Sequence, residues 1–226
     1  MAEQKSLSPT EQQFLALNDA YKYFNEILFN GELPGCILNF SRKKNTHGFL
    51  APYRWKKVGE QDFSIHEISL TPTTLYRSPK EIFSTLVHEM VHLWQFEFGS
   101  PSRSGYHNKE WSLKMEEVGL IPSRTGKEGG KRTGQQVSHF VEKNGRYEQA
   151  FEKMPEQYTL PFTSWEGNVM RRLLDANGGD GKQQKAVTRG RYKTKFTCSN
   201  CGDNAWGKPT LQLVCGKCEQ PFQTIV

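Results

Sequence analysis

Residues 85–92 carry side chains whose types and spacing could do chemistry, because His88, Glu89 and His92 form a His-Glu-x-x-His motif. On a helix, positions i and i+4 lie on the same face, so the two histidines can present imidazole nitrogens to one metal ion. Zinc favours such ligands, and a catalytic zinc keeps one coordination position open for water. Glu89 follows the first histidine and could reach that water rather than the metal. It is the natural general base.

The sequence around the motif predicts a helix that is buried on most sides. Ser78 and Glu81 form a capping box with Pro79 at the first helical position, and Gly99 and Pro101 supply the stop. Most positions between them are apolar, so the motif would place polar groups in an apolar wall. A metal ion would offset the cost of burying them. The alternative is a coincidental pentapeptide on a core helix, which the agreement between motif and helix signals disfavours.

The chain has 226 residues, a hydrophobic content of 35% and a mean hydropathy of −0.71. This length suffices for one domain with a core plus a smaller appendage. No apolar run approaches the length of a membrane span, and the first residues lack the apolar core of a secretory signal. We therefore expect no membrane partner. We also expect the protein to be a monomer. It would be cytoplasmic, or in the nucleoid or nucleus with DNA, and not secreted.

Signals along the chain predict helices packed on a small sheet, an α+β fold. A second capping box opens a helix from about residue 9 to Phe29, and residues 37–40, 48–51 and 62–70 have strand character. A short amphipathic helix ends at Gly119, a loop covers residues 122–134, residues 137–141 alternate like a strand, and residues 163–175 could form another helix. The pair Asn144-Gly145 is compatible with a hairpin turn or with the start of a helix.

His107 lies between a loop and the short helix, where the chain could return it to the metal as a third ligand. Spacing alone leaves this open, because an isolated loop histidine can equally be a solvated side chain. We assign no role to His47, His66 or His139, which are interpreted as structural or surface histidines. Cys36 stands beside apolar residues and is interpreted as a small buried hydrophobe.

The other four cysteines form two Cys-x-x-Cys pairs separated by 13 residues: Cys198, Cys201, Cys215 and Cys218. In an intracellular chain this pattern indicates zinc rather than disulfides. Two such turns facing each other make a closed tetrahedral site, a zinc ribbon, and residues 192–197 and 211–214 have the strand character that a ribbon needs. Four thiolates leave no open position, so this zinc should be structural and should supply much of the folding free energy of the segment.

The net charge of +6 lies in the C-terminal segment. Residues 182–226 carry eight basic and two acidic residues, whereas residues 1–181 carry 22 of each. Phosphate-binding cations mixed with aromatic side chains are typical of a single-stranded nucleic-acid surface. The candidate residues are Lys185, Arg189, Arg191, Tyr192, Lys193, Lys195 and Trp206. The alternative is a solvated basic linker whose neighbouring aromatics form the core of a small domain, and the charge favours nucleic acid.

These residues together resemble the SprT-like zinc metalloproteases, a family that includes a eukaryotic DNA–protein crosslink protease. The resemblance rests on a leading helix that ends in Tyr-Phe-Asn-x-x-Leu-Phe-x-Gly-x-Leu-Pro, on the metal motif, on Gly-Tyr-His-x-x-Glu-Trp around His107, and on the four-cysteine ribbon. It covers roughly residues 10–120 and 190–220. The segment around His107 has one tyrosine, Tyr106, more than the family pattern.

The resemblance implies that His107 is the third ligand of a catalytic zinc and that the protein cleaves proteins associated with DNA. The expected organisation is a metalloprotease domain over residues 8–175, a flexible basic linker over 176–190 and a zinc ribbon over 191–226. The expected cofactors are one catalytic and one structural Zn²⁺. The alternative function is a non-catalytic nucleic-acid-binding or transcription-linked protein with two structural zinc sites, but such a site needs no base at Glu89.

Overall fold

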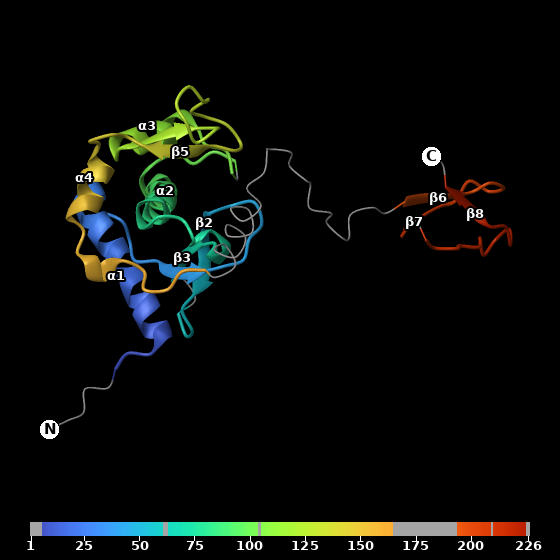
Figure 1. Cartoon of the computed structure of the whole chain (residues 1–226), viewed down its shortest axis with the longest axis horizontal. Coiled ribbons are helices and arrows are strands. Elements are labelled where there is room, and N and C mark those ends of the chain that lie inside the picture. The colour runs from blue at the N-terminus through green and yellow to red at the C-terminus, as the bar shows by residue number, and fades with distance from the viewer. Residues whose placement is uncertain (1–5, 61–62, 104, 165–193, 209, 225–226) are drawn as a thin grey trace, which may run out of the picture. The chain divides into compact units, whose positions relative to one another are not determined.

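A computed structural model of the 226-residue chain describes residues 6–60, 63–103, 105–164, 194–208 and 210–224 (Figure 1). The chain divides into two compact units, Met1–Asn177 and Gly178–Val226. The predicted linker over 176–190 and most of the helix predicted over 163–175 lie outside the described residues. Among the described residues, no helix is both long enough and apolar enough to cross a lipid bilayer.

The described residues of the first unit form four α-helices and two small sheets, so the predicted α+β class is confirmed. In chain order its elements are α1 (Pro9–Phe29), β1 (Ile37–Phe40), β2 (Gly48–Lys56), β3 (Ser64–Leu70), the 3-10 turn η1 (Pro72–Thr74), α2 (Pro79–Phe98), α3 (Lys109–Glu117), β4 (Leu120–Ser123), β5 (Ser138–Val141), α4 (Arg146–Lys153) and the 3-10 turn η2 (Glu156–Tyr158). The first three strands form one sheet in the order β1-β3-β2, and β4 pairs with β5.

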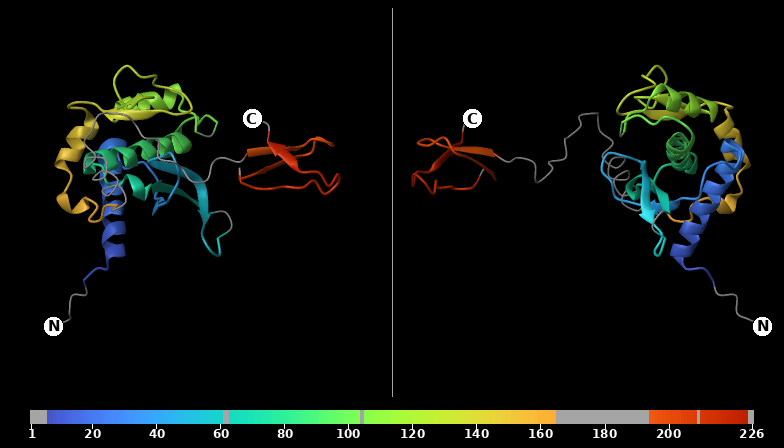
Figure 2. Two further views of the ribbon diagram at one scale, coloured as in Figure 1. Left: turned by 45° about the vertical axis from the view of Figure 1, so that its right-hand side comes forward. Right: turned by 180° about the vertical axis from the view of Figure 1, so that it is seen from behind.

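Helix α2 is the centre of this unit. Figure 1 shows it end-on, with α3 and β5 on one side, α1 and α4 flanking it, and the sheet of β2 and β3 on the other side; the views in Figure 2 agree. Twelve of its residues are buried, including His88 and Glu89. Both predicted capping boxes are present, at Ser8 for α1 and at Ser78 for α2. The local signals therefore set where the central helix begins.

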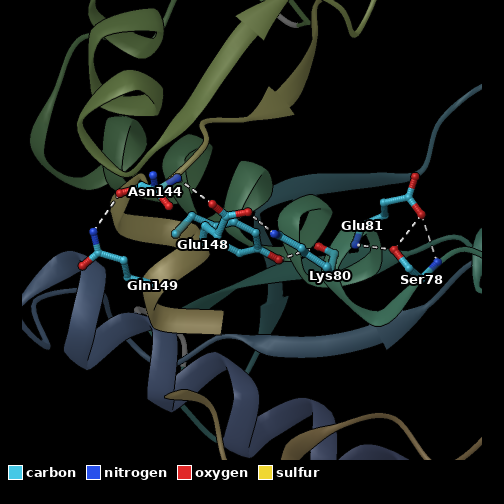
Figure 3. Close-up of polar contacts among 7 residues, drawn as sticks. Ser78, Lys80, Glu81, Asn144, Glu148 and Gln149 are labelled. Carbon is cyan, nitrogen blue, oxygen red and sulfur yellow. Dashed lines mark hydrogen bonds and ion pairs between the residues drawn. The ribbon is translucent and has the colours of Figure 1, made fainter. Parts of the chain in front are cut away.

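Helix α4 is fastened to the first turn of α2 by polar contacts (Figure 3). Lys80 forms an ion pair with Glu148, and the backbone N–H of Asn144 also donates to that carboxylate. The hydrogen bond from Lys80 is the largest cause that holds the pKa of Glu148 below its usual value. Gln149 closes the turn by donating to the carbonyl of Asn144 over 2.7 Å.

The pair Asn144-Gly145 starts a helix and does not form a hairpin turn. Asn144 has a left-handed φ of 58°, and Gly145 is the N-cap of α4. The turn packs closely on Gly119, where an added Cβ would lie 2.7 Å from the backbone nitrogen of Arg146. Glycine is therefore required at position 119 by both this approach and its φ of 85°.

Within the part of the second unit that the structure describes, β6 (Thr194–Cys198), β7 (Asn204–Gly207) and β8 (Phe222–Thr224) form a three-stranded antiparallel sheet in the order β7-β6-β8. The strand predicted over 192–197 corresponds to β6, with residues 192 and 193 outside the described part. The strand predicted over 211–214 is wrong. There the chain is irregular apart from an isolated bridge between Val214 and Pro221, because it turns directly into the second pair of cysteines.

Candidate active site and metal centres

Three histidines converge on one point of the first unit. His88 and His92 come from α2, and His107 comes from the residue before the Asn108 N-cap of α3. Backbone hydrogen bonds in both directions between His107 and Gly134, 2.8 and 3.0 Å long, hold the third histidine in place. One ring nitrogen from each of the three histidines lies within 4.8 Å of the corresponding nitrogens of the other two.

This donor set fits zinc. The Nε2 atoms of His92 and His107 are 3.2 Å apart. A tetrahedral zinc with Zn–N bonds of about 2.0–2.1 Å would hold two nitrogens about 3.3 Å apart. Three imidazoles leave the fourth position of such a site open, which is the arrangement of catalytic zinc.

The site keeps its histidines in the neutral form, which is the form that binds a metal. Burial, followed by the neighbouring histidines, lowers the pKa of His88 well below its usual value. Burial and then His107 lower the pKa of His92 to about 3. Burial also lowers the pKa of His107. No proton needs to be displaced from these rings at neutral pH.

Trp111 of α3 packs against all three histidine rings. Its ring centroid lies 4.3 Å from that of His107, 4.9 Å from His88 and 5.1 Å from His92. The indole is fully buried, and its Nε1 has no hydrogen-bond partner among the residues that the structure describes. Trp111 therefore restricts the ring positions by shape rather than by polar contact.

Glu89 lies on α2 against strand β2. Burial raises its pKa to about 8, opposed by a hydrogen bond from the Leu50 backbone and by Lys43. A divalent cation beside the carboxyl would favour the ionised form. Gly48 makes the close approach possible, since an added Cβ would lie 3.0 Å from Thr85 Cγ2 and 3.3 Å from Glu89 Cγ.

The structure reveals a contact that sequence reasoning missed, on His139 of β5. Its Nδ1 lies 3.1 Å from Nδ1 of His88, and its Nε2 lies 2.9 Å from Oγ of Ser84. Burial is the largest cause that lowers the pKa of His139 to about 3. The expectation that His139 is a structural or surface histidine did not include this pairing, because the two residues are 51 positions apart.

The other residues interpreted as structural are not members of the three-histidine cluster. Nε2 of the buried His66 lies 2.8 Å from a carboxylate oxygen of Glu97 at the end of α2. Cys36 is half-buried and packs against the core, and burial raises the pKa of its thiol to about 12. His47, one residue before β2, is exposed. After burial, its charge is one of the smaller causes that lower the pKa of His88 and of His139.

The four cysteines of the second unit also form a cluster whose ligand atoms all lie within 4.8 Å of one another. The two turns are built alike. Cys198 accepts from the N–H of Gly202 and Cys215 from that of Glu219, and both fourth residues after the cysteine have positive φ, 74° and 53°. The Sγ atoms of Cys201 and Cys215 are 3.6 Å apart. A tetrahedral zinc with Zn–S bonds of about 2.3 Å would hold them about 3.8 Å apart, so this donor set also fits zinc.

The structure describes two of the candidate nucleic-acid contacts, Lys195 and Trp206, and they are directly opposite each other across β6 and β7. Both are exposed, and Trp206 keeps 61% of its surface accessible. Phe196, by contrast, is buried in the ribbon. The remaining candidates, Lys185, Arg189, Arg191, Tyr192 and Lys193, lie outside the described residues.

Fold and site together define an α+β domain with a three-histidine centre of the His-Glu-x-x-His type. The sequence model of the SprT-like family matches residues 17–129, which span the leading helix and all three histidines. The chain belongs to the SprT-like family. An uncharacterised protein from the mucB 3′ region of Salmonella typhimurium is 39% identical over 61 residues, which is 26% of this chain and 80% of that protein.

Proposed function

We propose that this protein is a zinc-dependent endopeptidase in which His88, His92 and His107 hold the catalytic metal. The observation that carries the proposal is the convergence of three neutral imidazoles with a carboxyl group one residue along the same buried helix. A zinc ion held there would supply Lewis acidity that polarises a peptide carbonyl and makes water more acidic. The four cysteines would hold a second, structural zinc.

Glu89 is the proposed general base. Its carboxylate accepts a proton from the attacking water and delivers it to the nitrogen of the leaving amine. The amide of Leu50 and the charge of Lys43 both favour the ionised carboxylate that this step needs. The lack of a side chain at Gly48 leaves room for the Glu89 side chain beside β2.

The test compares two Glu→Gln variants on the same helix, with an unfolded polypeptide as substrate in the presence and absence of single-stranded DNA. Glu89→Gln should retain two zinc ions but lose cleavage. Glu97→Gln, the matched control, removes a carboxylate that pairs with His66 and should cleave as the parent does. Cleavage by Glu89→Gln at the parental rate would show that Glu89 is not the base.

We further infer that the basic C-terminal region binds single-stranded nucleic acid and brings DNA-associated proteins to the active site. The domain organisation that goes with this is a protease domain over 8–175, a linker over 176–190 and a ribbon over 191–226. The net charge of +6 in residues 182–226 and the opposed pair Lys195 and Trp206 support it. Truncation after Gly181 should remove most affinity for oligo(dT) and flatten its salt dependence. Unchanged binding would defeat the assignment.

The alternative is a non-catalytic nucleic-acid-binding protein with two structural zinc sites. This alternative gives Glu89 no role. The carboxyl of Glu89 is buried against β2, and its burial disfavours the charged form, so keeping it there has a cost that the alternative does not explain. Absence of cleavage by a parent chain that holds two zinc ions and binds oligo(dT) would favour this alternative.

A further inference from the structure

Hydrogen bonds link the metal centre to strand β5 through His139. Nδ1 of His88 contacts Nδ1 of His139 at 3.1 Å, and Nε2 of His139 contacts Oγ of Ser84 at 2.9 Å. The Ser84 hydroxyl donates to the carbonyl oxygen of Glu81 at 2.9 Å. Both ring nitrogens of His139 therefore face helix α2.

When Nε2 of His88 holds a metal, one arrangement of protons gives every hydrogen bond in this series a donor and an acceptor. Nδ1 of His88 then carries a hydrogen and donates it, so Nδ1 of His139 must accept. The neutral His139 ring carries its own hydrogen on Nε2 and donates it to Ser84. Since the Ser84 hydrogen points to Glu81, its oxygen has a lone pair with which to accept.

We propose that His139 is a positioning residue that fixes the tautomer and ring orientation of the zinc ligand His88. The inference rests on the proposed three-histidine zinc site and adds a residue to it. Nδ1 of the ligand His107 lies 3.2 Å from the Gly134 carbonyl oxygen. The segment 134–139 therefore contacts the Nδ1 atoms of two ligands, His88 and His107. This segment follows the residues that the family model matches. Groups that hydrogen-bond the ring nitrogen of a histidine ligand that does not bind the metal orient the ligand and raise metal affinity.

The test measures zinc affinity by competition with a chromophoric chelator, and the visible absorption of Co²⁺ bound in place of zinc. The ribbon zinc, on the other unit, is the internal reference. His139→Ala should weaken the histidine site about 10- to 100-fold and alter the Co²⁺ spectrum. His139→Asn should recover most of the affinity, because its Oδ1 can accept from His88 where Nδ1 did.

His66→Gln is the matched control, since it alters another buried histidine of the unit and should leave both readouts unchanged. If His139→Ala does not fold, the test rests on comparing His139→Asn with the parent and with Ser84→Ala. The His139→Asn and Ser84→Ala variants should both bind zinc more tightly than a chain that lacks His88. Parental affinity and spectrum in His139→Ala, or equal losses in the Ala and Asn variants, would overturn the proposal.

A second inference concerns the β2–β3 hairpin, which extends from the body of the first unit (Figure 2). Residues 42–60 contain six basic residues and one acidic residue, although residues 1–181 as a whole are neutral. The hairpin also exposes large aromatic side chains, Tyr53 at 52%, Trp55 at 42% and Phe63 at 48%. The zero net charge of residues 1–181 therefore conceals a local basic and aromatic surface.

The strand register places part of this surface on one face. Trp55 is opposite Ile65, and the backbone N–H of Lys57 donates to the carbonyl of Phe63. Trp55, Lys57 and Phe63 thus share a face, with the two aromatics as diagonal neighbours about 7–8 Å apart. Nζ of Lys57 lies 5.9 Å from the Phe63 ring centre. The Trp55 indole is held by a 2.7 Å hydrogen bond to Glu67.

We propose that this hairpin, with Trp55, Lys57 and Phe63 on one face and Lys56 and the neighbouring Arg54 alternating to the other, binds single-stranded nucleic acid. It extends the proposed nucleic-acid function to a surface of the protease unit. Edge strands are often protected by lysines, prolines and bulges, which accounts for the charges here but not for two exposed rings on one face. Bases stack on such rings while cations meet the phosphates.

The experiment uses the full chain and fluorescently labelled oligo(dT). Arg54→Gln/Lys56→Gln/Lys57→Gln should weaken binding and reduce the slope of log K against log salt by about 2, if each cation meets a phosphate. Phe63→Ala should weaken binding about fivefold or more. A control triple with the same charge change at exposed sites, Lys22→Gln/Lys109→Gln/Lys153→Gln, should bind as the parent does.

The outcomes separate this surface from the ribbon. Additive losses in the hairpin triple and in Lys195→Gln/Trp206→Ala would support two contacts. Loss in the ribbon variant alone would overturn the hairpin proposal and leave the ribbon assignment intact, and no binding by the parent would overturn both. If the triple binds oligo(dT) normally but cleaves unfolded polypeptide with a raised KM, the hairpin contacts protein and the proposal is wrong.

Discussion

Replacement of Trp111 separates the shape of its side chain from its polar atom. Trp111→Phe removes two ring carbons, worth about 1.6 kcal/mol of burial at about 0.8 kcal/mol per carbon. It also removes the buried Nε1–H, which has no partner among the described residues and whose desolvation costs about 1–3 kcal/mol. The two contributions nearly cancel, so the free energy of unfolding should change by less than about 1.5 kcal/mol.

Trp111→Ala should behave differently, because it leaves a cavity beneath three histidine rings. Large-to-small replacement of a fully buried aromatic costs about 3–5 kcal/mol. Zinc affinity at the histidine site should fall as well, whereas Trp111→Phe should keep it.

Urea unfolding followed by circular dichroism would measure both variants, in the presence of a chelator so that zinc binding does not contribute to stability. A loss above about 3 kcal/mol in Trp111→Phe would refute the reasoning, because it would mean that the indole nitrogen makes a stabilising contact.

Three further predictions follow from particular contacts. Gly48→Ala should lower the cleavage rate while both zinc ions are retained, since the new Cβ would lie 3.3 Å from Glu89 Cγ; parental kcat would contradict it. Cys36 should alkylate far more slowly at pH 8 in the folded chain than in urea, because burial raises its pKa to about 12 and keeps it protonated, and any stability from this thiol is lost only as the pH rises from about 9 toward 12. Peptide mapping would detect rapid labelling. Tyr147→Phe should lower the stability of the first unit by about 1 kcal/mol, because its buried hydroxyl donates to the Lys80 carbonyl, and an unchanged urea midpoint would show that this bond contributes nothing.

The helices that hold the site could be predicted from sequence because their signals are local. Ser78, Pro79 and Glu81 lie within one turn and set the start of α2, and the i, i+4 spacing then places His88 and His92 on one face. The ribbon cysteines were likewise brought together by their spacing.

What sequence could not reveal depends on pairing between distant segments. The contact between His139 and His88 requires β5 to lie along α2, and no local signal in residues 137–141 specifies that neighbour. Asn144-Gly145 suited a hairpin or a helix equally, and the choice depends on packing against Gly119. The basic hairpin surface does not show in the net charge, because acidic residues elsewhere in residues 1–181 cancel its basic residues.

Zinc content is the measurement that tests the central claim most directly. Elemental analysis of the purified parent should give two zinc ions per chain, one for each of the two ligand clusters, and a His88→Ala/His92→Ala variant should give one. One zinc ion in both proteins would contradict the account, because the histidines would then hold no metal and the protease proposal would lose its basis.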